Sequence, residues 1–459
     1  MASSMKSRTV TRRRFLGAAA KGTVGAAGLL GGLSGLAGSR LARAAKPVTL
    51  TVLLPEHWKA IQGIEQKNPS LVPPRRMWYY ERALQWEKDH PDIKLEHQSV
   101  TWDQIAPKFI AASQAGNPPD ILTVDGNEIA GLATGGFLYP LDQFKYDEWS
   151  DFNKDVVDYC TVNGRIYAMS FYVGLWLYFV NWKLLKAAGI TQPAKTWPEV
   201  VSQGKLLTKD TRGLGRPDQW GFGMTMASAA FQQGPSHLAQ IVWSLGGRVA
   251  DAQGRALIDT PEMAKAVQLV AELINKDKVM SRDVLTMPIN GQPDLFNSER
   301  WATGILHSSF YPPTVAALGK ETVGLAPFPV FPGGTTYGTV EVFVSAISTK
   351  AGKDPNKRDA AFELIKYFGA NETLWAAAKH QFGLPVRKSA VKNPIYTQDP
   401  ALGFLAQYTV DHGRPLPIIK EVRFYFETLM AAVTTAILGR ASIQAALQDA
   451  QRKYTERVR

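Results

Sequence analysis

The sequence has a single cysteine, Cys160, among its 459 residues. One cysteine excludes a disulfide within the chain, so the folded protein depends on its core for stability. The sequence also lacks an HExxH helix, a GxSxG nucleophile turn, a paired-carboxylate signature and the cysteine and histidine spacing of a zinc site. Its seven histidines are scattered along the chain. These absences argue against the common hydrolases and metalloenzymes, and we expect no catalytic residue, metal site or cofactor.

Acidic residues are absent from positions 1–44, which carry eight lysines and arginines. The whole chain has a net charge of +12 from 52 basic and 40 acidic residues. Without this segment 44 basic and 40 acidic residues remain, a net charge of +4. The rest of the chain contains no run of lysine and arginine with interleaved aromatic residues, so no nucleic-acid partner is expected.

The first 44 residues have the pattern of an export signal. Thr11–Leu16, TRRRFL, is similar to the twin-arginine motif, with the paired arginines and the Phe-Leu that follows them. The glycine- and alanine-rich stretch 17–36 is too polar for a membrane span, which needs about 20 strongly apolar residues. Ala42-Arg43-Ala44 has the small-x-small cleavage pattern. We predict a twin-arginine signal peptide over residues 1–44, cleaved near Ala44, with a disordered basic tail as the alternative.

The stretch Gly116–Asn127, GNPPDILTVDGN, predicts a buried strand that ends in a polar turn. Its two prolines break any preceding helix, and residues 121–124 form a short apolar run. Ligands of open α/β sheets bind beyond the carboxyl ends of the strands. Asp125 and Asn127 are therefore candidate ligand contacts, although an ordinary turn would have the same sequence.

An apolar run at 48–54 predicts the first buried strand. Glu56, His57 and Trp58 follow at its carboxyl end, where they could also be ordinary turn and surface residues. Residues 59–76 contain three prolines and two adjacent arginines. A helix is therefore not expected to begin immediately after this strand.

Two further strands carry informative side chains. Residues 170–181 are rich in aromatics, and the strand period of two places Tyr172 and Trp176 on one face. Glu341 interrupts an otherwise apolar strand at 337–348. Because an unpaired buried carboxylate is costly, Glu341 should face either a cation or a wet cleft.

Six motifs occur in a fixed order along the chain: EKDHPDIKLEHQSVTWDQI, GNPPDILTVDGN, GGFLYPLDQF, KTWPEVVSQGKLL, QWGFG and FGLPVRKSAV. Their order resembles that of extracellular solute-binding protein family 1 of ABC importers, which includes the maltodextrin-binding proteins. The resemblance covers nearly all of residues 46–459. It implies an α/β fold of the two-lobed periplasmic-binding-protein type (type II-like), with several crossing strands and a ligand cleft between the lobes. Two lobes also suit a chain longer than a single core, which rarely exceeds about 300 residues.

The resemblance also implies domain boundaries and a ligand site. After the signal peptide at 1–44, the N-lobe takes residues 45–172 and 327–347, and the C-lobe takes residues 173–326 and 348–459. Residues 59–76 look like an insertion relative to the family. Phe310 and Phe426 take positions that stack on sugars, and Arg423 precedes Phe426 by one turn. The predicted ligand-binding residues are Glu56, His57, Trp58, Asp125, Asn127, Tyr172, Trp176, Ser309, Phe310, Glu341, Arg423 and Phe426.

The sequence thus predicts the periplasmic substrate-binding component of an ABC importer, a monomer that is not an enzyme. It would close its lobes on a carbohydrate, mono- or oligosaccharide, or on a polyol. Its partners would be the ABC permease subunits with their ATPase and, before that, the twin-arginine export machinery. The alternatives are a secreted carbohydrate-active enzyme and a binding protein for a phosphorylated polyol. Arg75-Arg76 is the one hint of a phosphate site, but paired arginines on a loop are usually solvated.

Overall fold

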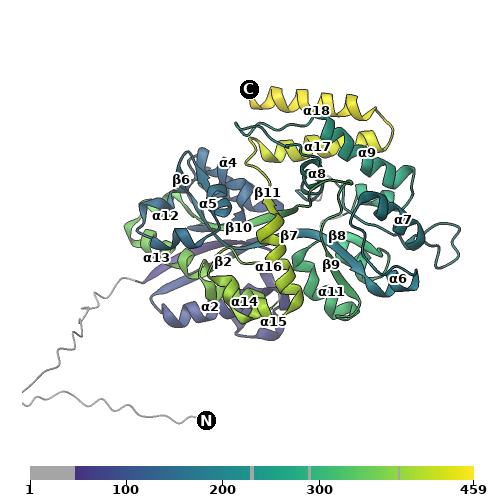
Figure 1. Cartoon of the computed structure of the whole chain (residues 1–459). Coiled ribbons are helices and arrows are strands. Elements are labelled where there is room, and N and C mark those ends of the chain that lie inside the picture. The colour runs from purple at the N-terminus through teal and green to yellow at the C-terminus, as the bar shows by residue number, and fades with distance from the viewer. Residues whose placement is uncertain (1–46, 228–231, 288–290, 381–382) are drawn as a thin grey trace, which may run out of the picture. The chain divides into compact units, whose positions relative to one another are not determined.

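The computed structural model describes residues 47–227, 232–287, 291–380 and 383–459. The predicted signal peptide therefore lies outside the described residues. None of the helices in these ranges is both long and apolar enough to span a membrane. Helices and strands alternate along most of the chain, as predicted for an α/β fold (Figure 1).

Within the described residues, nine strands form one mixed sheet, whose main path runs β2-β1-β3-β10-β7-β8. β4 and β11 pair with β10, β9 pairs with β7, and β5 and β6 form a separate pair. The strand bounds are β1 Val48–Pro55, β2 Ile93–Val100, β3 Ile121–Asp125, β4 Leu138–Tyr139, β5 Thr161–Val162, β6 Arg165–Ile166, β7 Ala168–Asn181, β8 Thr303–His307, β9 Val323–Ala326, β10 Gly338–Ser348 and β11 Gly413–Pro415.

Strand β7 runs through both halves of the sheet (Figure 1). Its first part pairs antiparallel with β10, and its second part pairs antiparallel with β8 and β9. All 14 of its residues are buried, which explains the nearly continuous apolar and aromatic sequence. We call β1, β2, β3 and β10 the first half of the sheet, and β8, β9 and the end of β7 the second half.

Helices cover the sheet, and their bounds are α1 Trp58–Gln66, α2 Met77–Asp89, α3 Ile105–Gln114, α4 Ile129–Thr134, α5 Lys154–Tyr159, α6 Trp182–Ala187, α7 Trp197–Leu207, α8 Gln233–Ser244, α9 Pro261–Asn275, α10 Gly291–Asn297, α11 Tyr311–Leu318, α12 Thr349–Lys353, α13 Pro355–Phe368, α14 Asn371–Lys379, α15 Pro394–Gln398, α16 Pro400–His412, α17 Val422–Ile437 and α18 Ile443–Val458. α17 contacts α8, α9 and α18.

Helices α13 and α14 belong with the first half of the sheet. α13 contacts β1 and β10, and α14 contacts α2, where Arg82 Nε donates to Thr373 Oγ1 at 3.1 Å. Lys357 of α13 also pairs with the buried Asp120 at 2.8 Å. These contacts place α13 and α14 beside the first half of the sheet, and the assignment of residues 348–459 to the C-lobe stays a prediction. The periodicity of the sequence predicts an apolar helix face, but it does not say which part of the sheet that face covers. The other lobe boundaries stay a prediction.

Two predictions about where helices begin can be compared with the structure. The expected start at Thr196 is confirmed, because Thr196 and Glu199 form a capping box, with Glu199 Oε2 accepting from the Thr196 N–H at 3.1 Å. The expectation that no helix follows β1 directly is wrong, because α1 begins at Trp58. Glu56 adopts a left-handed conformation, φ 52°, which turns the chain from the strand into the helix. The prolines of residues 59–76 instead begin two short 3-10 turns, η1 Pro69–Leu71 and η2 Pro74–Arg76.

Candidate ligand-binding site

Four polar or aromatic side chains meet where the two halves of the sheet join. Asp125 is the last residue of β3, and Glu341 lies in the neighbouring β10. Across β7, Glu341 lies opposite Gly174, and Trp176 lies opposite His307 of β8. A Cβ atom at Gly174 would lie 1.9 Å from His307 Nε2. Glycine at this position therefore leaves the room that the imidazole occupies.

These side chains face a cavity of about 840 Å³, its open mouth included. The lining combines charged, amide, hydroxyl and aromatic side chains with one valine: Glu56, Arg75, Arg76, Trp102, Val124, Asp125, Glu128, Tyr172, Trp176, Gln232, Gln233, His307, Ser309, Phe310, Glu341 and Phe343. Seven of the twelve predicted ligand-binding residues are among them: Glu56, Asp125, Tyr172, Trp176, Ser309, Phe310 and Glu341.

The two central carboxylates, Asp125 and Glu341, are held in place by donors. Trp176 Nε1 donates to Glu341 Oε1 at 2.7 Å, and Gln232 Nε2 donates to Asp125 Oδ2 at 2.8 Å. The backbone N–H of Asn127 donates to Asp125 Oδ1 at 3.1 Å. Burial raises the pKa of both carboxyl groups, and the charge of Asp125 raises the pKa of Glu341 further. The ionised pair is therefore stabilised by any ligand that brings hydroxyl donors.

His307 presents a neutral ring to the cavity. Burial lowers its pKa to about 3, so the 3.5 Å approach of Nε2 to Glu341 Oε2 is not an ion pair at neutral pH. The backbone N–H of Ser309 donates to His307 Nδ1 at 3.3 Å, which assigns the ring proton to Nε2. His307 is therefore a donor on the cavity wall.

Aromatic rings supply the apolar part of the lining. The ring centroids of Trp102 and Phe343 lie 5.2 Å apart, and those of Tyr172 and Phe343 lie 4.7 Å apart. Phe310 lies edge-on to His307 with the centroids 6.3 Å apart. Ring faces beside fixed acceptors and donors suit a ligand with apolar faces and a polar rim.

Five of the predicted residues are not among the described residues that line this cavity: His57, Trp58, Asn127, Arg423 and Phe426. Trp58 is the first residue of α1 and is 49% exposed. Asn127 lies behind the lining, where its Nδ2 donates to Gln232 Oε1. Asn127 therefore orients Gln232, which in turn holds Asp125.

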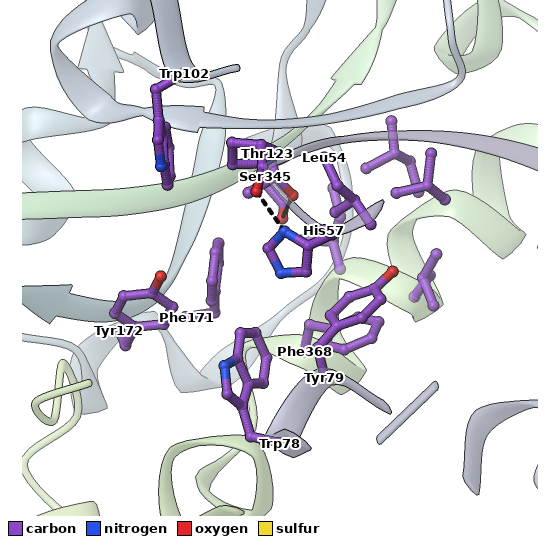
Figure 2. A pocket seen from close by; sticks show the side chains of 15 residues that line it. Leu54, His57, Trp78, Tyr79, Trp102, Thr123, Phe171, Tyr172, Ser345 and Phe368 are labelled. Carbon is purple, nitrogen blue, oxygen red and sulfur yellow. Dashed lines mark hydrogen bonds between the residues drawn. The ribbon is translucent and has the colours of Figure 1, made fainter. Parts of the chain in front are cut away.

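His57 lies in a separate aromatic pocket next to the cavity (Figure 2). Its Nδ1 is 2.5 Å from the Pro55 carbonyl oxygen, and its ring lies edge-on to Tyr79 with the centroids 4.8 Å apart. Trp102 and Tyr172 line both this pocket and the cavity. The left-handed turn before His57 directs its ring into the core, where burial lowers its pKa well below the usual value.

Arg423 and Phe426 lie on α17. Arg423 Nη2 is 2.7 Å from Glu128 Oε1, and Nη1 donates to the Asp103 carbonyl at 3.2 Å. Glu128 itself lines the cavity, so Arg423 acts on the site through Glu128. Phe426 is 2% exposed and packs beside Tyr425 in the core. The predicted ligand contacts on α17 were placed from the family resemblance, and neither residue is among the described residues that line this cavity.

Nine residues of the lining were not predicted as ligand contacts: Arg75, Arg76, Trp102, Val124, Glu128, Gln232, Gln233, His307 and Phe343. The expectation of a solvated arginine pair is wrong for Arg76, which is 3% exposed. Gln232 could not be found from local sequence, because its role depends on its contact with Asp125, 107 positions away. For His307 a signal existed in the apolar run that ends at this residue, since strand ends carry ligand contacts.

A strand shared by two halves of an α/β sheet, with a polar and aromatic cavity where they join, defines a two-lobed solute-binding protein. The chain belongs to the bacterial extracellular solute-binding protein family, whose model matches residues 74–374.

Relatives and solved structures agree with this assignment. A binding protein of Brucella abortus is 22% identical over 82% of this chain and 88% of its own length. The mannitol-binding protein of Pseudomonas aeruginosa is 24% identical over 42% of this chain and 43% of its own length. The maltose/maltodextrin-binding domain of Bdellovibrio bacteriovorus bound to maltotriose has the same fold, with a TM-score of 0.75, 21% identity, and coverage of 90% of this chain and 100% of that domain.

Proposed function

We propose that this protein is the periplasmic substrate-binding component of an ABC importer and that its ligand is a carbohydrate or a polyol. The observation that carries the proposal is the cavity itself, in which the fixed acceptors of Asp125 and Glu341 lie beside aromatic rings. Hydroxyl groups of a sugar would donate to the carboxylates, and its C–H faces would lie on the rings. The names of the similar proteins, which bind mannitol and maltotriose, support the same ligand class.

The runner-up function is a secreted glycosidase, and one observation favours it. Two carboxyl groups with raised pKa values share one cavity, and glycosidases use such pairs as acid and base. The family and the similar structures are binding proteins, which supports binding without turnover. Trp176 Nε1 and Gln232 Nε2 each donate to one oxygen of Glu341 and Asp125, which leaves lone pairs of the carboxyl oxygens to accept from ligand hydroxyls.

One experiment separates these functions. The purified protein is titrated in a calorimeter with mono-, di- and trisaccharides and with polyols, and its thermal unfolding is recorded in parallel. A ligand that binds only the folded state stabilises it by about 2.7 kcal/mol at a hundredfold excess over Kd. Binding with the sugar recovered unchanged supports the proposal, whereas release of smaller sugars supports the glycosidase. The absence of binding by any sugar or polyol would refute the proposal.

The proposal also includes the export pathway of the protein and its oligomeric state. Residues 1–44 would direct export by the twin-arginine machinery, and a monomer would then deliver its ligand to the permease subunits and their ATPase. Substitution of both Arg12 and Arg13 by lysine should keep the precursor in the cytoplasm of a host that has this machinery. Cell fractionation measures this outcome, and a cleaved periplasmic product of the double variant would contradict it.

A further inference from the structure

The cavity has a cationic end formed by Arg75 and Arg76. Both arginines belong to the short turn η2, which follows Pro73 and begins with Pro74. Two consecutive prolines restrict the backbone before the arginines, so the turn is held in one conformation. Arg76 is 3% exposed, while the Arg75 side chain is 40% exposed at the rim. The turn η2 thus brings two guanidinium groups to the wall of the cavity.

Two positively charged side chains, Arg75 and Arg76, line this end of the cavity. Burial lowers the pKa of Arg76, and the charge of Arg75 lowers it further, while Tyr172 and Glu56 raise it. Arg75 and Glu56 are among the charged groups that shift this pKa. Glu56 lies 4.0 Å from Arg75, the outer limit of an ion pair. An arginine remains charged even when it is buried, and both arginines line the cavity together with Glu56.

The anionic end adjoins the cationic end at Tyr172. Burial raises the pKa of the Tyr172 phenol, the charge of Arg76 lowers it, and the charge of Glu341 raises it. Both charges therefore act on the same hydroxyl group. Along β7, Tyr172 precedes Gly174, which lies opposite Glu341, by two residues, and two residues of a strand span about 7 Å. A monosaccharide-sized ligand could touch both ends.

A neutral sugar would satisfy the acceptors at the anionic end but would leave hydroxyl groups against two guanidinium groups. A planar guanidinium binds a carboxylate or a phosphate through two parallel hydrogen bonds, which a hydroxyl cannot accept. We propose that the ligand is a sugar or polyol that carries one anionic group, a carboxylate or a phosphate ester, bound by Arg75 and Arg76. This inference rests on the proposed function and narrows its ligand class.

The test compares matched neutral and acidic ligands by calorimetry on the wild-type protein. The pairs are galactose with galacturonate, glucose with glucuronate, mannitol with mannitol 1-phosphate, and glycerol with glycerol 3-phosphate. We expect the acidic member of at least one pair to bind about 30-fold or more tightly than the neutral member, the effect of one well-formed charge pair. Its affinity should fall as sodium chloride is raised. The uronate and phosphate pairs show which anion the site takes.

Variants test whether the two arginines cause the preference for the acidic ligand. The readout is the ratio of the two Kd values within a pair. Arg76→Gln should remove the preference, Arg76→Lys should retain part of it, and the exposed Arg216→Gln, which changes the net charge equally, should leave it intact. Arg75→Gln, at the rim, tests the same cationic end if Arg76→Gln does not fold. It should also reduce the ratio of the two Kd values.

The outcomes separate the two proposals. Equal or tighter binding of the neutral members would overturn the anionic ligand and leave the sugar-binding function standing. An acid preference that survives both Arg76→Gln and Arg75→Gln would overturn the role of these arginines. The absence of binding by every member of every pair would overturn the anionic ligand, and the titrations with di- and trisaccharides would then decide the proposed function.

Discussion

The carboxyl group of Glu341 should make the ligand-free protein less stable as pH rises. Its side chain is 11% exposed, and it receives a hydrogen bond from Trp176 Nε1 at 2.7 Å. Burial and the charge of Asp125 raise its pKa. Replacing Glu341 with glutamine keeps the shape and an oxygen acceptor for the indole but removes the ionisation. The free energy of unfolding of the variant should therefore lack the part of its pH dependence that Glu341 causes.

The sign and size of the effect of pH on stability follow from proton linkage. In the unfolded chain a glutamate has a pKa of about 4.3. Between that pH and its higher folded pKa, the folded protein holds a proton that the unfolded chain has released. The stability from Glu341 is complete below about pH 4 and falls by at most about 1.4 kcal/mol per pH unit through this window, the limit for one proton. Buried His57 and His307, whose folded pKa values are lowered, act in the opposite direction, but they do so in both proteins.

Urea unfolding of both proteins without ligand, at pH 5, 6, 7 and 8, measures the effect. The free energy of unfolding of Glu341→Gln minus that of wild type should grow by about 1 kcal/mol per pH unit until it levels off. The exposed Glu321→Gln is the matched control and should show no such trend. A difference that stays constant from pH 5 to pH 8 would refute the reasoning. The same substitution should weaken ligand binding, because the carboxylate reduces stability but supplies an acceptor.

Three other substitutions test the geometry of the site. Gly174→Ala should displace His307, whose Nε2 would lie 1.9 Å from the new Cβ, and it should lower the free energy of unfolding by about 2 kcal/mol together with the ligand affinity. Phe310→Ala should weaken ligand binding by about tenfold in calorimetry, because it removes a ring from the cavity wall. Phe426→Ala should instead destabilise the protein by about 3 kcal/mol in urea, since Phe426 is 2% exposed. Equal losses of affinity in the two phenylalanine variants would contradict their different positions.

Much of the fold and part of the site follow from local sequence. The alternation in 170–181 predicts a strand with Tyr172 and Trp176 on one face, and both line the cavity. The cost of burying an unpaired carboxylate indicated Glu341 as a candidate site residue, and Glu341 also lines the cavity. In each case a short-range rule was sufficient, because the side chain lies on the face that its own strand dictates.

Other parts of the site depend on contacts between distant segments. Arg76 follows two prolines on a loop, a context typical of solvated arginines, and only the packing of η2 beside Tyr172 buries it. His57 follows a strand as a ligand residue would, but the left-handed Glu56 turns it toward Pro55 and Tyr79. No local pattern encodes these outcomes, because each is decided by a partner far along the chain or by one strained turn.

Arg423 gives a last prediction, in which a residue outside the cavity controls affinity. Its guanidinium joins α17 to Glu128 at 2.7 Å and to the Asp103 carbonyl at 3.2 Å, two residues that follow strands of the first half. Arg423→Gln removes this link and should favour separation of α17 from these strands. A ligand that requires α17 to lie against these strands then binds more weakly. Its apparent affinity falls in proportion to the fraction of molecules that remain in this arrangement.

When Glu128 is also replaced with glutamine, the loss should be the same factor for neutral and acidic ligands, because Glu128 lines the cavity and Arg423 is not among the described residues that line it. In contrast, Arg76→Gln should act on the acidic ligand. Calorimetry with one matched pair therefore distinguishes the two arginines. If Arg423→Gln in the Glu128→Gln background changed the ratio of the two Kd values as strongly as Arg76→Gln does, Arg423 would have to contact the ligand itself. The cavity would then have a different cationic wall from the one that the structure shows.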